Sequence, residues 1–183
     1  MAELLTHVLL AYAVFTVLGW YVEWIDDRWI AVGMVGSILP ELNRLALVVP
    51  SGWVSSVLGV PFAWDGLHTV VGTALLSGIG ALLFGSSTHR RRAFLVLFAG
   101  GLSHLIVDLP QRYADGKLLT NEYLFPLTTW RPPTPGWYVS ADRWVLLLAV
   151  GVTLAILLLD RYRSWPSDAG SASTGTVPDR GQP

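Results

Sequence analysis

Five apolar segments alternate with short polar stretches along this chain. They run from about residue 4 to 24, 29 to 49, 66 to 84, 93 to 109 and 144 to 159. Each is close to the ~20 residues with which a helix crosses the hydrocarbon core of a bilayer. Pro40 interrupts the second segment, so we expect the helix there to kink or end. The pattern predicts an all-α, polytopic membrane domain over residues 1–163, with about five transmembrane helices.

Three regions lack the pattern of a span. Residues 53–62 form a short apolar piece after a Pro-Ser-Gly break, and we expect them to lie at the membrane interface. Residues 110–143 are rich in Pro, Trp and Tyr, which suits an ordered loop at the membrane–water boundary. Residues 164–183 are rich in Ser, Gly, Pro and Asp, which predicts a disordered tail.

Composition agrees with a membrane protein. The chain is 52% hydrophobic and only 14% charged, whereas soluble domains carry roughly 25% charged residues. The formal net charge of −1 argues against nucleic acid as a partner. Because the chain has no cysteine, neither a disulfide framework nor a thiolate metal site can form.

The basic residues predict an orientation in the cell membrane. The arginine run at residues 90–92 places the loop between the third and fourth segments in the cytoplasm. Arg161 and Arg163 place the C-terminus there as well. Five spans then leave the N-terminus outside, together with the 110–143 loop, although this loop holds four basic residues.

Histidines and carboxylates stand inside or beside the apolar segments, where ionisable side chains are costly and usually functional. Because successive spans alternate in direction, these residues are all expected at one depth, near one face of the membrane. The pattern therefore predicts a single candidate site. Its members are His7, Glu41 with Asn43, Asp65 with His68, and His104 with Asp108.

The spacing of these residues suits a metal ion. His104 and Asp108 are four residues apart and share one helix face, and Asp65 and His68 do the same if a helix begins that early. Histidine and carboxylate are usual ligands of zinc and manganese. Gly100 precedes His104, and small residues of this kind let a neighbouring helix approach closely.

Simpler interpretations stay open for each residue. His7 alone is equally well a hydrogen-bonded packing residue, and Glu41 alone suits an interfacial helix end. Asp65 is as good a candidate for the N-cap of the third segment as for a site residue. His104 with Asp108 is the pair least easily explained by packing alone.

These motifs resemble a known family. Their order is Thr-His-Val-Leu-Leu, Leu-Pro-Glu-Leu-Asn, Leu-His-Thr, Leu-Ser-His-Leu-Ile-Val-Asp-Leu and Leu-Phe-Pro-Leu, over roughly residues 5 to 130. It is similar to the membrane-bound metal-dependent hydrolases of the YdjM type, which are thought to be related to zinc-dependent phospholipase C and P1-type nucleases. The resemblance implies a divalent metal, zinc first and manganese second. It implies as metal ligands His7, Glu41, His68, His104 and Asp108.

The chain also departs from the family pattern. Asn43 stands where the family has a second aspartate, and Ala63-Trp64-Asp65 stands where it has His-Arg-Gly. We therefore expect one metal, with Glu41 as a fifth ligand or as a base, in place of a multi-metal cluster.

The resulting prediction is a metal-dependent hydrolase that acts on a phosphoester, such as a lipid head group, through a metal-activated water. Glu41 or Asp65 would take the proton of the water. The alternative is a non-catalytic metal-binding membrane scaffold, that is, a degenerate family member. A metal- or proton-conducting path is disfavoured, because the inner halves of the segments are nearly all apolar.

Overall fold

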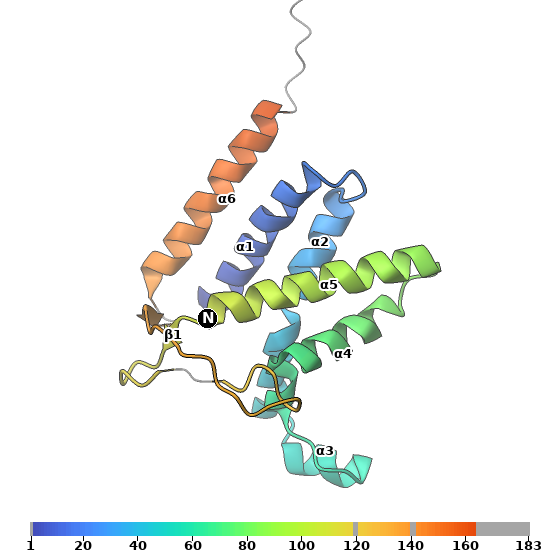
Figure 1. Cartoon of the computed structure of the whole chain (residues 1–183), viewed down its shortest axis with the longest axis vertical. Helices are drawn as coiled ribbons and strands as arrows, with labels where there is room; N and C mark the ends of the chain where they lie inside the picture. The colour runs from blue at the N-terminus through green and yellow to red at the C-terminus, as the bar shows by residue number, and fades with distance from the viewer. Residues whose placement is uncertain (1, 119–120, 140–141, 164–183) are drawn as a thin grey trace, which may run out of the picture.

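The computed structural model describes residues 2–118, 121–139 and 142–163, and the regular secondary structure within them is almost all helical, as predicted (Figure 1). The tail predicted to be disordered lies outside the described residues. The described chain contains a small parallel sheet of two strands, β1 (Gln111–Arg112) and β2 (Tyr138–Val139), each two residues long. The helical elements, in chain order, are α1 (Ala2–Gly19), α2 (Asp27–Gly36), the 3-10 helix η1 (Leu39–Leu47), α3 (Ser51–Leu58), the 3-10 helix η2 (Trp64–His68), α4 (Val70–Ala81), α5 (Ser87–Asp108) and α6 (Arg143–Arg163).

Two stretches of the described chain are long and apolar enough to cross a membrane, namely 27–47 and 143–163. The apolar helices at 4–19 and 70–81 are shorter. Five spans therefore stay a prediction. The first of the two stretches changes its helical form as expected near Pro40: α2 ends at Gly36, and η1 has the proline in its first turn. Proline suits that position because the first turn of a helix leaves its N–H groups unpaired.

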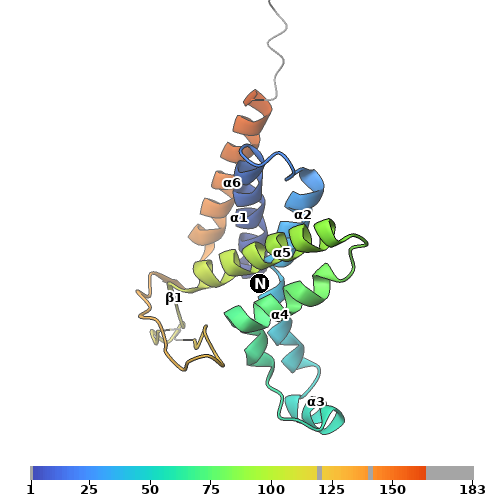
Figure 2. The ribbon, with the colours of Figure 1, turned by 45° about the vertical axis from the view of Figure 1, so that its right-hand side comes forward.

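The helices do not form a parallel bundle. In Figures 1 and 2, α4 and α5 run across the direction of α1, α2 and α6. Helix α5 packs against α2 and α4, and α1 packs against α2 and α6. The start of α1, the end of α2, the start of α4 and the end of α5 all reach the same region, which carries the candidate site.

Glycines allow the close approach of α5 to its neighbours. A Cβ atom at Gly100 would collide with the carbonyl oxygen of Gly33, and one at Gly36 would collide with the backbone of α5. On the other side of α5, a Cβ at Gly101 would collide with the side chain of Thr73 in α4. The predicted role of the small residues before His104 is therefore confirmed.

Arginines and tryptophans gather at the opposite end of the molecule, which we call the arginine end. The guanidinium carbon of Arg92 lies 4.9 Å from the centroid of the Trp24 ring, and that of Arg163 lies 4.9 Å from the Trp20 ring. The indole of Trp20 also donates a hydrogen bond to Asp160 at 2.7 Å. These contacts connect α5 and α6 to the end of α1.

The start of α4 corrects one interpretation of Asp65. Thr69 is the N-cap of α4, since its hydroxyl oxygen accepts a hydrogen bond from the backbone N–H of Gly72 at 3.0 Å. Asp65 lies four residues earlier in η2, and the interpretation of this residue as the N-cap was wrong. Its side chain is exposed and remains available to the neighbouring cleft.

The loop between α5 and α6 folds back toward the helix ends. The backbone N–H of Val70 donates to the carbonyl of Tyr123 at 2.8 Å, and the hydroxyl of Tyr138 donates to the carbonyl of Val107. The described part of this loop is thus attached to the start of α4 and to the end of α5, on either side of the candidate site.

Candidate metal centre

Asp108, in the last turn of α5, is the meeting point of three imidazole rings. Its Oδ1 lies 3.1 Å from Nε2 of His7 in α1, and its Oδ2 lies 3.2 Å from Nε2 of His68 in η2. The same Oδ2 lies 3.1 Å from Nε2 of His104, one turn earlier in α5. The side chains of His7, His104 and Asp108 are 2%, 0% and 8% exposed, so these three groups are buried.

Glu41 adds a second carboxylate from η1. Its Oε1 lies 3.7 Å from Nε2 of His104, and its side chain is 11% exposed. The ligand atoms form two overlapping sets, each with all atoms within 4.8 Å of one another. One set is His7, Glu41 and His104, and the other is His68, His104 and Asp108. All five residues predicted as ligands are therefore brought together.

Asp65 and Asn43, the two further predicted site residues, lie farther out. Both line the cleft beside the cluster, and Asp65 belongs to neither of the two ligand sets. Asp65 is accordingly placed to meet a molecule in the cleft, not to bind a metal together with His68.

The ring of His104 is oriented as a metal ligand would be. Its Nδ1 lies 2.8 Å from the carbonyl oxygen of Ser37, the residue that caps the end of α2. A carbonyl only accepts, so Nδ1 carries the hydrogen, and Nε2 of the neutral ring presents a lone pair to the cluster. This Nε2 is buried and makes no hydrogen bond with a described residue. Backbone carbonyls fix metal-binding histidines in this way.

The donor set fits a zinc-sized divalent ion. The rings of His7 and His104 are stacked with their centroids 3.7 Å apart, around a buried carboxylate. Histidine lone pairs and carboxylate oxygens repel one another unless a proton or a cation lies between them, and a divalent ion would serve all of these groups at once. Two ligand atoms on a tetrahedral zinc, each at about 2.0–2.1 Å, are about 3.3 Å apart. The observed separations between histidine nitrogens and Asp108 oxygens are 3.1 and 3.2 Å.

Neighbouring side chains hold the two carboxylates. The amide nitrogen of Gln111 donates a hydrogen bond to Asp108 Oδ1, and Arg44 forms a salt bridge with Glu41. Gln111 was not among the predicted site residues, although its spacing of three residues from Asp108 is a usable signal. The group of Ser37 that orients His104 is its backbone carbonyl, so no residue type in the sequence indicates it.

The cluster opens into a cleft of about 790 Å³. Glu41, His68 and Asp108 line its inner part, and the arginines that line it are Arg44, Arg112 and Arg131. The guanidinium of Arg131 contacts Glu122 at 2.8 Å, and Arg44 is paired with Glu41. Arg112 forms no salt bridge with a described residue, so its charge is available to an anion in the cleft.

Tyr123 lies behind the cleft with its ring centroid 6.2 Å from that of His68. Its burial, with the negative charge of Asp108 nearby, raises the pKa of the Tyr123 hydroxyl to about 12. The hydroxyl therefore keeps its proton at physiological pH.

The sequence profile of the YdjM inner membrane protein family matches residues 1–175. The chain belongs to this family. Membership in the YdjM family agrees with the resemblance carried by the motifs and shows that the chain is a membrane protein. No curated protein and no solved structure matches the chain. The more distant relationship to phospholipase C and P1-type nucleases stays a prediction.

Proposed function

We propose that this YdjM-family protein is a membrane-bound, metal-dependent hydrolase that acts on a phosphoester. One observation supports the proposal most strongly: three histidine nitrogens converge on one buried carboxylate, and this cluster faces a cleft lined by arginines. A purely structural cluster needs no such opening. His7, His68, His104 and Asp108 would hold one divalent ion, zinc before manganese, and Glu41 would be a fifth ligand or a base.

A bound divalent ion would lower the pKa of a water and polarise the scissile ester. In hydrolysis the water oxygen forms a new bond to phosphorus, the ester P–O bond breaks, and the leaving oxygen takes up a proton. Glu41 or Asp65 would accept the proton of the water, because both carboxylates line the cleft.

The arginines favour phosphorus over carbon esters as the substrate. Guanidinium groups bind phosphate oxygens in a bidentate manner. The charge of Arg112 is not neutralised by a described carboxylate, whereas Arg44 and Arg131 already have acidic partners. Arg112 is therefore the residue we assign to the substrate phosphate.

We further propose that the metal centre faces the outside of the cell membrane and that the arginine end faces the cytoplasm. Positive residues accumulate on the cytoplasmic side, and tryptophan favours both interfaces. Arg92, Arg163, Trp20 and Trp24 meet at the end of the molecule remote from His104. This orientation leaves the N-terminus outside and the C-terminus inside.

The function is tested with detergent-purified protein and a panel of phosphomonoesters and phosphodiesters. We expect the wild type to hydrolyse at least one of them and His68→Ala to lose nearly all of that activity, because His68 is a ligand that also lines the cleft. His89→Ala, which changes an exposed histidine at the start of α5, is the matched control. A wild type that binds metal stoichiometrically but cleaves none of the panel would favour the non-catalytic scaffold.

A second prediction concerns Arg112. Replacing Arg112 with glutamine is expected to raise KM for the phosphoester about 10- to 100-fold, with little change in kcat, since one charge-assisted hydrogen bond contributes about 1.5–3 kcal/mol. Steady-state kinetics separate the two constants. Arg28→Gln, at an exposed position that does not line the cleft, should leave both unchanged. An unchanged KM in Arg112→Gln would contradict the assigned role.

A further inference from the structure

Helix α3 is largely exposed. None of its residues is buried, and Trp53, Val57 and Leu58 are 62%, 64% and 56% exposed. The flanking residues continue this surface, since Leu47 and Val48 on one side are 86% and 81% exposed. We call residues 47–62 the apolar hairpin. A surface of this kind is unfavourable in water and marks a contact with a membrane or another protein.

Ionisable residues are absent from the whole region around the apolar hairpin. Between Arg44 and Asp65 the 20 residues at 45–64 contain no Asp, Glu, Lys, Arg or His. The region directly continues a stretch, residues 27–47, that is long and apolar enough to cross a membrane. The hairpin therefore follows directly on a candidate span. A tryptophan at this depth suits the boundary between head groups and acyl chains.

The apolar hairpin is folded, not merely extended. The hydroxyl of Ser55 accepts a hydrogen bond from the backbone N–H of Phe62 at 2.9 Å. The indole of Trp64 donates to the carbonyl of Val49 at 2.8 Å, which connects the two ends of the hairpin. Its polar groups are thus partly satisfied within the segment, while its apolar side chains point outward. This combination is suited to insertion into the edge of a lipid leaflet.

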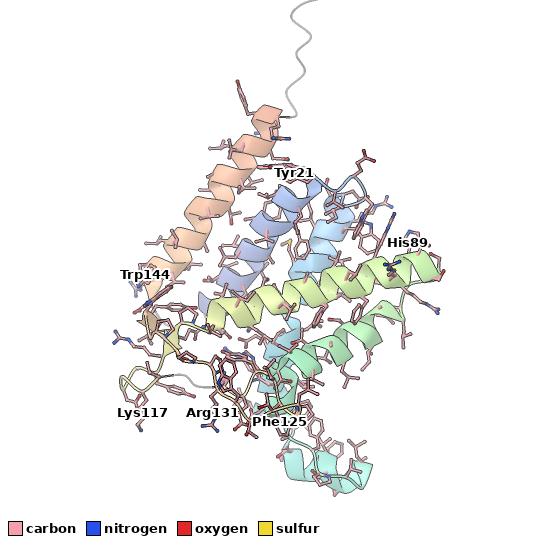
Figure 3. All side chains as sticks on the ribbon, in the orientation of Figure 1. Tyr21, His89, Lys117, Phe125, Arg131 and Trp144 are labelled. Atoms are coloured by element: carbon pink, nitrogen blue, oxygen red, sulfur yellow. The ribbon has the colours of Figure 1, made fainter. Side chains whose placement is uncertain are left out.

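The apolar hairpin also stands next to the cleft. The elements at its two ends supply lining residues of the cleft, Glu41 and Arg44 from η1 and Asp65 and His68 from η2. In Figure 3, Phe125 and Arg131, which also line the cleft, lie on the same lower side of the molecule as α3. A molecule held against the hairpin is therefore beside the entrance to the metal centre.

We infer that the apolar hairpin lies in the phospholipid leaflet on the side of the metal centre, and that the cleft takes its phosphoester laterally from that leaflet. The acyl chains of the substrate would stay beside α3 while its phosphate reaches Arg112 and the histidine cluster. The substrate class is then a lipid-borne phosphoester, not a soluble one. The lateral uptake of the substrate rests on the proposed function, whereas the position of the hairpin in the leaflet does not.

The position of the hairpin is measured with a spin label, which the absence of native cysteine makes straightforward. Val57→Cys and Lys117→Cys are each labelled and reconstituted in phospholipid vesicles. Lys117 is the control because its side chain is 82% exposed and charged. We expect the label at 57 to be relaxed more by oxygen than by a water-soluble nickel chelate, and the label at 117 to show the reverse.

Two results of this experiment would overturn the inference. A label at 57 that is as accessible to the nickel chelate as the label at 117 would place α3 in water. A label at 57 shielded from both reagents, together with disulfide-linked dimers of the unlabelled Val57→Cys protein, would show that a second copy of the chain covers the hairpin instead.

Lateral uptake of the substrate is tested by comparing a phospholipid in vesicles with a short, water-soluble phosphodiester. Val57→Asp should lower turnover of the vesicle-borne substrate about tenfold or more and leave turnover of the soluble one unchanged. Lys117→Asp, which adds the same side chain in the loop, should affect neither. Equal losses on both substrates would contradict lateral uptake. A wild type inactive on both would reject the proposed function, while the spin label still decides where the hairpin lies.

Discussion

Replacing His104 with alanine is expected to remove nearly all of the bound metal from the purified protein. His104 belongs to both overlapping sets of ligand atoms, its ring is fully buried, and its Nε2 has no hydrogen-bond partner among the described residues. Removal of a partner that only orients a ligand typically costs 10- to 100-fold in metal affinity. Loss of the ligand itself should exceed that. Elemental analysis of the detergent-purified protein gives the metal content directly.

The control for this experiment lies in the same helix. His89 is an exposed residue in the first turn of α5, and its Nδ1 lies 2.5 Å from the hydroxyl oxygen of Ser86. His89→Ala should retain the wild-type metal content. Circular dichroism of both variants shows whether the helical fold persists. Stoichiometric metal in a folded His104→Ala protein would reject the metal centre, and with it the proposed hydrolysis.

The convergence of the five candidate ligands could be predicted because two elementary rules act together. Ionisable side chains are costly in an apolar segment, so their presence marks a site, and the alternation of the segments gives them a common depth. The i,i+4 spacing of His104 and Asp108 places both on one face of α5, where they lie 3.1 Å apart. The depth argument needs only that each segment reverses the direction of the chain, not that each one spans the membrane.

Other features had no signal in the residue types. Ser37 acts through its backbone carbonyl, which every residue has, so nothing in the sequence distinguishes it. The N-cap of α4 is Thr69 and not Asp65, because the chain forms the separate 3-10 turn η2 first. Both residue types are good N-caps, and only the path of the backbone decides between them.

The basic residues of the 110–143 loop conflicted with the predicted orientation, and the cleft explains two of them. Arg112 and Arg131 line it. Residues that line a cleft can be retained for binding, and they then report little about topology. A charge count over a loop therefore misleads when the loop contributes to a binding site.

Replacing Gly100 with alanine is expected to destabilise the protein and to weaken metal binding together. The new Cβ would meet the carbonyl oxygen of Gly33 and lie 2.9 Å from the backbone nitrogen of Ser37. These are backbone atoms of α2 and its cap, so the helices must move apart. Overpacking of this kind costs about 1–3 kcal/mol. The same movement draws the carbonyl of Ser37 away from Nδ1 of His104 and releases the ring that it orients.

The matched control is Gly78→Ala, which makes the same change in α4 at a position with no atom within 4 Å of the new Cβ. Alanine is a better helix former than glycine by about 1 kcal/mol, so this variant should be as stable as the wild type or more so. Thermal unfolding in detergent, with and without added zinc, separates the two effects. Gly100→Ala should have the lower Tm, and added zinc should raise its Tm less than that of the wild type. Gly78→Ala should show the full rise in Tm with zinc. Equal Tm values and equal zinc gains in the two variants would show that the α2–α5 contact does not position His104.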